Sequence, residues 1–202
     1  MIYYISYFFF KTLSALFFPL KVVGREHLPA DTGFILASNH ISNLDPFILG
    51  LASRRRLSYV AKDTLFRNKA LSYLLSRVDA FPIKRGASDF RAMRETLRRI
   101  KKGLPVVLFP EGTRQPVEGG TDKKVHEGIG FIVSKSGAPV IPAYIKDSQR
   151  VLAPGTKVLK RHRVTVIFGA PLRFNPTQSY SDIAHEVMYK ISDLSFQRLK
   201  YF

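Results

Sequence analysis

The sequence predicts an α/β protein with a mixed, mostly parallel central sheet flanked by helices. Apolar runs rich in β-branched residues alternate with helical patterns along the chain. Several of these runs are continuously apolar, which is typical of central strands buried on both faces. The chain has 202 residues, of which 46% are hydrophobic, and no Gly/Ser-rich or Pro-rich linker divides it. These features favour one domain with a substantial core.

The elements follow in a regular order. Helical patterns are visible in the apolar N-terminal segment and then at 46–53, 64–78, 88–103, 128–137 and 179–200. The predicted strands are 21–24, 33–39, 57–62, 80–84, 105–110, 139–145 and 163–169.

The N-terminal segment, residues 1–20, is nearly all apolar or aromatic. It has neither the basic start nor the small-residue cleavage site of a signal peptide. Lys11 would lie in the middle of a transmembrane span, where a charge is costly. Tyr and Phe crowd the segment, as they do at membrane interfaces. We therefore predict a membrane-associated hydrophobic helix over 1–20 and a single domain over 21–202; a buried packing helix is the alternative.

The net charge of the chain limits the classes of molecule that it is expected to bind. A formal net charge of +17 implies anionic partners: nucleic acid, an anionic membrane or a phosphorylated substrate. No nucleic-acid-binding motif is visible, so no nucleic acid is expected. The absence of Cys excludes thiolate metal sites and a Cys nucleophile, and it fits a reducing compartment.

The helix predicted over 88–103 has two faces. Its core face is expected to hold Phe90, Met93, Leu97 and Ile100. A basic stripe beside that face consists of Arg91, Arg94, Arg98 and Lys101. The stripe is either a solvated surface or a surface that lies against anionic lipid headgroups.

The first candidate site lies in "ASNHISNLDPF", between a predicted strand and a predicted helix. Pro46 suits the first helical position, which places Asp45 at the N-cap and His40 in the loop before it. A carboxylate there can accept a backbone N–H and still hold an imidazole N–H. The other imidazole nitrogen would then be a base. A structural capping network is the alternative, and Ser38 and Ser42 leave a serine acyl-enzyme open.

Three further motifs follow at predicted strand ends. "FPIKRG" carries Lys84 and Arg85, and "FPEGTR" carries Glu111, Gly112, Thr113 and Arg114. Gly112 permits a tight turn, and the Arg114 guanidinium is a forked donor suited to phosphate. The fourth motif, "VIP", contains Ile141 and Pro142.

In this order, the four motifs resemble those of the glycerolipid acyltransferase family, above all the 1-acyl-sn-glycerol-3-phosphate acyltransferases. The resemblance covers most of the chain, from the end of the N-terminal helix to about residue 168. It implies an acyltransferase domain that moves a fatty acyl group from acyl-ACP or acyl-CoA to the sn-2 hydroxyl of lysophosphatidic acid, giving phosphatidic acid. It also implies that no metal or other cofactor is needed, and that the enzyme lies on an anionic membrane with its site facing the cytoplasm (the inner membrane in a bacterium).

The resemblance also assigns roles to residues. His40 would be the general base and Asp45 would orient it. The acceptor and its phosphate would be bound by Lys84, Arg85, Glu111, Gly112, Thr113 and Arg114. Ile141 and Pro142 would shape the acyl-donor side.

One departure concerns the acceptor. Many family members carry a Lys one or two residues before a Gly that opens a helix, whereas His126 and Glu127 precede Gly128 here. The open alternatives are another lysolipid or glycerol 3-phosphate as acceptor, a thioester or lipid hydrolase that uses the same dyad, and a basic binding module without activity.

Overall fold

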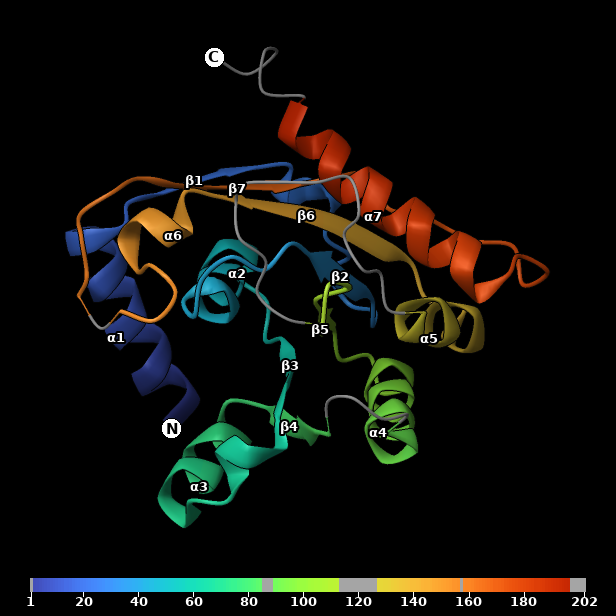
Figure 1. Cartoon of the computed structure of the whole chain (residues 1–202), viewed down its shortest axis with the longest axis horizontal. Helices are drawn as coiled ribbons and strands as arrows, with labels where there is room; N and C mark the ends of the chain where they lie inside the picture. Colours follow the sequence, from blue (N-terminus) through green and yellow to red (C-terminus); the bar gives the residue numbers. More distant parts are fainter. Residues whose placement is uncertain (1, 85–88, 113–126, 157, 197–202) are drawn as a thin grey trace.

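A seven-stranded mixed sheet organises the protein (Figure 1). The computed structural model describes residues 2–84, 89–112, 127–156 and 158–196. The strands are β1 (Leu20–Val23), β2 (Ile35–Ser38), β3 (Ser58–Lys62), β4 (Ala80–Ile83), β5 (Val106–Leu108), β6 (Val140–Lys146) and β7 (Val164–Phe168). Their order is β1-β7-β6-β2-β5-β3-β4, and every neighbouring pair is parallel except β6 and β7. The predicted mixed, mostly parallel sheet is confirmed.

Helices connect most of the strands. They are α1 (Ile2–Phe17), α2 (Asp45–Ser53), α3 (Lys69–Arg77), α4 (Phe90–Lys101), α5 (Gly128–Ser136), α6 (Ser148–Val151) and α7 (Tyr180–Phe196), with 3-10 turns at η1 (Arg25–His27) and η2 (Asp63–Phe66). The helix predicted over 64–78 is divided, because the Asn68 side chain accepts the Leu71 N–H at 3.0 Å and starts a new helix. The short helix α6 was not predicted, since four residues are too few to show a helical period.

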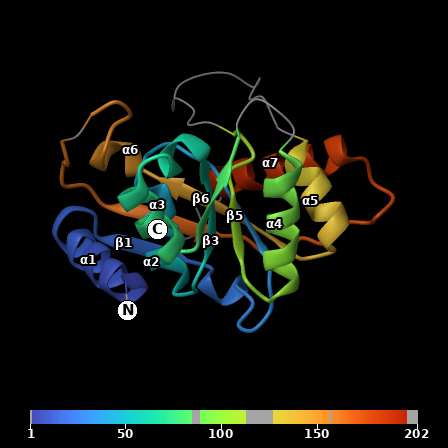
Figure 2. The ribbon, with the colours of Figure 1, turned by 90° about the horizontal axis from the view of Figure 1, so that it is seen from below.

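The sheet separates two apolar layers, and Figure 2 shows α1, α2 and α3 on one side of the strands and α4 and α5 on the other. Along β2, Leu36 belongs to the same core cluster as Ile48 of α2, whereas Ile35 and Ala37 belong to the cluster that contains Ile183 of α7. This alternation follows from the two-residue period of a strand. The buried strand β2 is thus anchored on both faces at the point where the candidate site begins.

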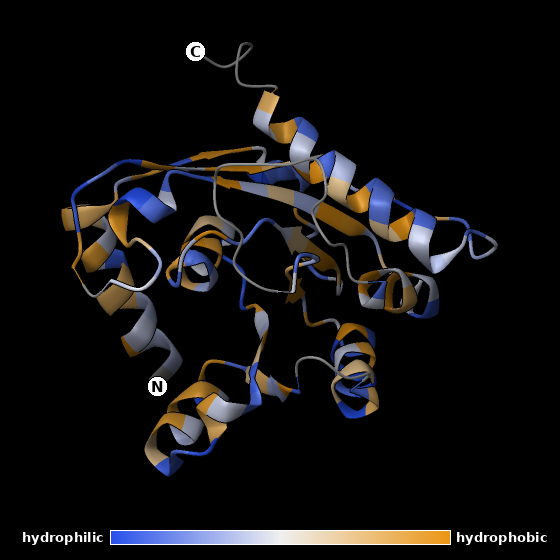
Figure 3. Cartoon of the chain, in the orientation of Figure 1, coloured by the Kyte–Doolittle hydropathy of each residue, from blue (hydrophilic) through white to orange (hydrophobic). Residues whose placement is uncertain are grey.

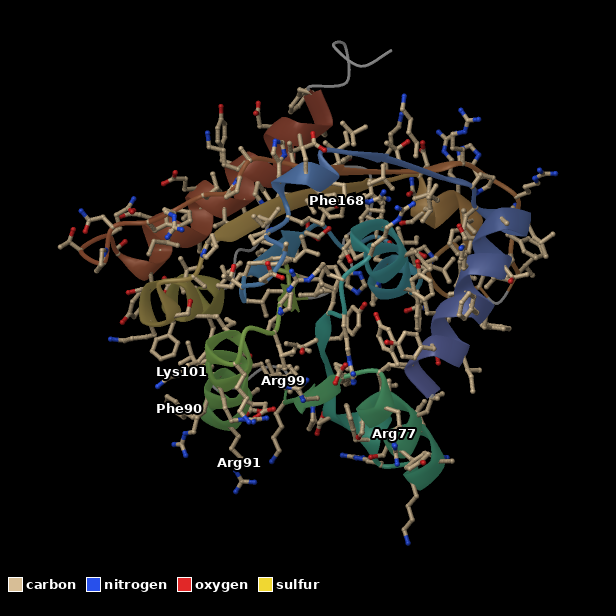
Figure 4. The ribbon with its side chains drawn as sticks, turned by 180° about the vertical axis from the view of Figure 1, so that it is seen from behind. Arg77, Phe90, Arg91, Arg99, Lys101 and Phe168 are labelled. Carbon is tan, nitrogen blue, oxygen red and sulfur yellow. The ribbon has the colours of Figure 1, made fainter. Side chains whose placement is uncertain are left out.

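Helix α4 differs from its prediction at one residue. Its buried side chains are Ala92, Thr96 and Ile100, while Phe90 is 69% exposed and lies on the outer side of the helix (Figure 4). Because Phe90 precedes Thr96 by six residues, it is rotated by about a third of a turn from the centre of the buried face. The predicted core face is therefore wrong for Phe90.

Helix α1 is apolar on both its packed and its exposed sides (Figure 3). Phe10 stacks on Phe47 of α2, with ring centroids 3.8 Å apart, and Phe18 directly beyond the helix is fully buried. On its other side, Phe8 and Phe9 are 60% and 61% exposed. Within the described ranges, no helix has the length and apolar character needed to cross a bilayer. The predicted N-terminal helix is present, and its association with a membrane stays a prediction.

Candidate active site

Four of the predicted site residues that the structure describes follow the ends of parallel strands. Strands β2, β5, β3 and β4 run in the same direction, so their carboxyl ends meet at one edge of the sheet. His40 follows β2, Glu111 and Gly112 follow β5, and Lys84 follows β4. The predicted residues Arg85, Thr113 and Arg114 lie outside the described ranges.

A hydrogen bond joins His40 to Asp45. The Nδ1 atom of His40 lies 2.9 Å from Oδ2 of Asp45, and the Asp45 side chain is fully buried. The same Oδ2 accepts the backbone N–H groups of Ile41 and Ser42, at 2.7 and 2.8 Å. The second carboxylate oxygen, Oδ1, accepts the hydroxyl of Ser148 at 2.6 Å. A buried carboxylate with these partners holds the imidazole in one orientation.

The predicted N-cap role of Asp45 is wrong. Asp45 is the first residue of α2, and Leu44 occupies the N-cap without a side-chain capping bond. A turn closed by the Asp45 N–H and the Ser42 carbonyl starts the helix one residue early. The carboxylate therefore folds back over its own loop and binds that loop's N–H groups.

Two further contacts hold His40, one at its ring and one at its backbone. Its ring stacks on the Phe109 ring, with centroids 4.1 Å apart and an interplanar angle of 18°. Its backbone N–H donates to Oε2 of Glu111 at 3.2 Å. Glu111, which is buried, thus links the third sequence motif to the first. Gly112 closes the turn after β5 with a φ of 66°, a conformation that favours glycine.

A cavity of about 360 Å³ begins at His40 and Phe109. Its walls come from α1, α2, β3, η2, α3 and the strands β4 and β5, and they are mostly apolar. Tyr59 contributes a hydroxyl to this wall, and burial raises the pKa of that hydroxyl well above its ordinary value, so it stays neutral. His40 therefore borders a space suited to a hydrocarbon chain.

The two serines beside the dyad are occupied elsewhere. The Ser38 hydroxyl donates to the Asn39 carbonyl at 3.1 Å, and the Ser42 hydroxyl donates to the Leu152 carbonyl at 2.9 Å. Both residues are fully buried, and neither lines the cavity. This arrangement disfavours a serine acyl-enzyme. Among the described residues, no three potential ligands gather into a metal site.

Two predicted groups do not line the cavity beside His40. Ile141 and Pro142 lie early in β6, beside Leu36 and Ala37 of β2, and neither lines the cavity. Lys84 is exposed, and its backbone N–H donates to Asp89 at 2.8 Å. The roles predicted for these residues stay predictions.

The sequence did not predict the contacts that distant segments make with His40 and Asp45. It assigned no role to Phe109, although this residue lies in the quoted motif, and it did not identify Ser148 at all. Ser148 lies 103 residues from Asp45, so no local spacing signals their contact. The apolar residues at 3, 7 and 10 were assigned to a membrane helix, and they also form a wall of the cavity.

Comparisons with known proteins agree with the motifs. The family model described as Acyltransferase matches residues 19–146. The chain is 29% identical, over 90% of its length and 86% of the other chain, to the 1-acyl-sn-glycerol-3-phosphate acyltransferase of Bacillus subtilis. A chloroplastic enzyme of the same name from Brassica napus is 30% identical over 77% of this chain, which spans only 46% of that relative.

A solved structure supports the fold. The crystal structure of the 1-acyl-sn-glycerophosphate acyltransferase of Thermotoga maritima matches with a TM-score of 0.80 and 22% identity, over 100% of this chain and 81% of that one. The resemblance predicted from the sequence is confirmed by these matches. The chain belongs to the Acyltransferase family.

Proposed function

We propose that this protein transfers a fatty acyl group from an acyl thioester, acyl-ACP or acyl-CoA, to the sn-2 hydroxyl of lysophosphatidic acid, which yields phosphatidic acid. The observation that carries the proposal is the His40–Asp45 pair at the edge of an apolar cavity. The names of the relatives support the choice of acceptor.

The dyad supplies the base for this reaction. Asp45 accepts the Nδ1–H of His40, so Nε2 takes the proton of the acceptor hydroxyl. The hydroxyl oxygen attacks the thioester carbonyl, and the tetrahedral intermediate collapses with loss of the thiolate. The proton on Nε2 passes to that thiolate, which restores His40. General-base catalysis of this kind contributes about 10²–10⁴-fold in rate.

The acceptor phosphate would lie at the carboxyl edge of the sheet. Gly112 turns the chain directly after β5, and Lys84 stands exposed at the end of β4, so its ammonium can bind a phosphate at this edge. Arg85, Thr113 and Arg114 are proposed to complete this site. The formal net charge of +17 favours such an anionic substrate.

We further propose that α1 rests on an anionic membrane, with the active site on its cytoplasmic side. A helix that exposes several large apolar side chains and a single charge, at Lys11, is unusual at a water-exposed surface. The exposed Phe8 and Phe9 would enter the interface, and the net positive charge would hold the protein to anionic headgroups. α1 also lines the cavity, so a lipid chain could enter it from the bilayer.

The experiment incubates membranes that contain the protein with lysophosphatidic acid and a labelled acyl thioester, and separates phosphatidic acid from free fatty acid. We expect phosphatidic acid from the wild type and a loss of about 10²–10⁴-fold with His40→Ala. His185→Ala, on α7 across the sheet, is the matched control and should retain activity.

The alternatives give different products. Free fatty acid without phosphatidic acid would indicate a hydrolase. Product formed only with another lysolipid or with glycerol 3-phosphate would change the acceptor, and undiminished acyl transfer by His40→Ala would overturn the proposed role of the dyad.

A further inference from the structure

The Asp45 carboxylate is held from two unequal sides. Three donors, the Nδ1–H of His40 and the N–H groups of Ile41 and Ser42, all bind Oδ2. These donors belong to one short loop. Oδ1 accepts the Ser148 hydroxyl, which comes from the first residue of α6.

The Ser148 hydroxyl binds the carboxylate oxygen that the loop donors do not contact. This bond is 2.6 Å long and fully buried, so it gives a buried acceptor its partner and adds a second point at which rotation about the Cβ–Cγ bond is resisted. The orientation of the carboxylate in turn sets the direction in which the His40 ring points.

The chain around Ser148 is shaped to deliver this hydroxyl. Asp147, directly before it, has a φ of 68°, a left-handed conformation that Asp adopts more readily than most residues. This turn ends β6 and directs Ser148 back toward the sheet. The Asp147 carboxylate lies near Lys146, Arg150 and His162, at 3.7, 3.3 and 3.8 Å. Strained backbone held in place by several contacts is common at functional sites.

Two more contacts join the same segments. The Asn39 side chain exchanges two hydrogen bonds with the backbone of Ile145, at 2.9 and 2.7 Å. The Ser42 hydroxyl donates to the Leu152 carbonyl at 2.9 Å. Residues 145–152 therefore contact the segment 39–45 at three places, Asn39, Ser42 and Asp45. The family model ends at residue 146, so Ser148 lies just past the matched residues.

We propose that Ser148 is a positioning residue for acyl transfer, which acts by fixing the Asp45 carboxylate and through it the His40 imidazole. The inference rests on the proposed role of the dyad. Ser148 does not line the cavity, so its loss should lower kcat and leave substrate binding nearly unchanged.

The test measures kcat and KM for lysophosphatidic acid and the acyl thioester in the full-length protein. Ser148→Ala should lower kcat by about tenfold to a hundredfold, with both KM values within about threefold of wild type. Ser148→Thr, which keeps the hydroxyl, should recover much of the loss. Ser53→Ala removes another buried serine hydroxyl, at the far end of α2, and should retain kcat.

A double-mutant cycle separates positioning from general destabilisation. If Ser148 acts through the carboxylate, Ser148→Ala should have little further effect on kcat in an Asp45→Asn background. An equal loss in both backgrounds would overturn the proposal, as would wild-type kcat for Ser148→Ala while His40→Ala is inactive. Full activity of His40→Ala would instead overturn the proposed function, and this inference with it.

Discussion

His40 lies between a polar environment on one side and an apolar environment on the other. On one side, the Asp45 carboxylate accepts four hydrogen bonds in a fully buried position. On the other side, a mostly apolar cavity of about 360 Å³ opens between helices of the same layer. Hydrogen bonds demand particular distances and angles, whereas apolar contacts tolerate many arrangements.

The difference assigns different tasks to the two sides. The polar side is suited to hold one side chain in one orientation, which the proton transfer requires. The apolar side is suited to accept flexible chains by shape and burial. Substitutions on the polar side should therefore act on kcat, and those on the apolar side on substrate use or membrane binding.

The largest effect is expected for Asp45→Ala. It leaves the Ser148 hydroxyl and the loop donors without their acceptor, so the free energy of unfolding should fall by about 3–5 kcal/mol. We also expect kcat to fall by about 10²–10⁴-fold, because His40 loses its orientation. Denaturant titration and steady-state kinetics measure the two effects. Asp182→Ala, at an exposed residue of α7, is the control. A normal kcat for Asp45→Ala would show that the Asp45 carboxylate is not needed for catalysis.

The second prediction concerns the exposed side of α1, which faces away from the cavity. Replacing Phe8 and Phe9 with Ala should weaken binding to anionic vesicles by about a hundredfold, because fully burying a Phe contributes about 1.5–3 kcal/mol and these two side chains, 60% and 61% exposed, can still bury only that part. A vesicle-sedimentation assay measures this change. The matched control replaces Tyr189 and Phe196, which are at least as exposed on α7 across the sheet. Equal loss in both pairs would show that α1 has no special contact with the membrane.

The third prediction concerns the lining of the cavity. A Cβ added at Gly50 would lie 2.6 Å from the Tyr59 hydroxyl, and both residues line the cavity. We expect Gly50→Leu to disfavour long acyl chains, by about fourfold for each methylene that it excludes, since a methylene contributes about 0.8 kcal/mol. Competition between long and short thioesters or lysolipids measures this preference.

A second variant, Gly50→Ala, adds only the Cβ that would meet the Tyr59 hydroxyl. Tyr59→Phe removes that oxygen, so it should partly restore the properties of the wild type when it is combined with Gly50→Ala. An unaltered chain preference in Gly50→Leu would show that the acyl chain lies outside this cavity.

The smallest effect is expected far from both sides, at Glu95. Hydrogen bonds from Arg98 and Arg99 lower the pKa of Glu95 from 4.5 to about 2. Because the folded pKa is the lower one, this contribution to stability is present above pH 4.5 and is lost as the pH falls toward 2. The carboxylate is partly exposed, so Glu95→Gln should cost only about 0.5–1 kcal/mol at pH 7. Unfolding at several pH values measures it, and a cost that persists at the lowest pH would contradict the ion-pair explanation.

Much of the fold could be predicted because its signals are local. The continuous apolar runs of β2, β5 and β6 and the alternation of strands with helices determined an α/β sheet. The spacing of His40 and Asp45 and the turn at Gly112 likewise carried their meaning within a few residues. The proximity of His40 and Asp45 could therefore be predicted from the sequence, although the sequence alone left a structural capping network as the alternative to a catalytic pair.

The tertiary structure decided the contacts between distant segments. Three contacts join residues far apart in the chain. Phe109 stacks on His40, the His40 backbone N–H donates to Glu111, and the Ser148 hydroxyl donates to Asp45. It also rotated Phe90 out of the core and placed α1 against the cavity. A sequence pattern records the preferences of neighbours along the chain, whereas these contacts depend on strand order and on the path of each connection, which packing of the whole chain determines.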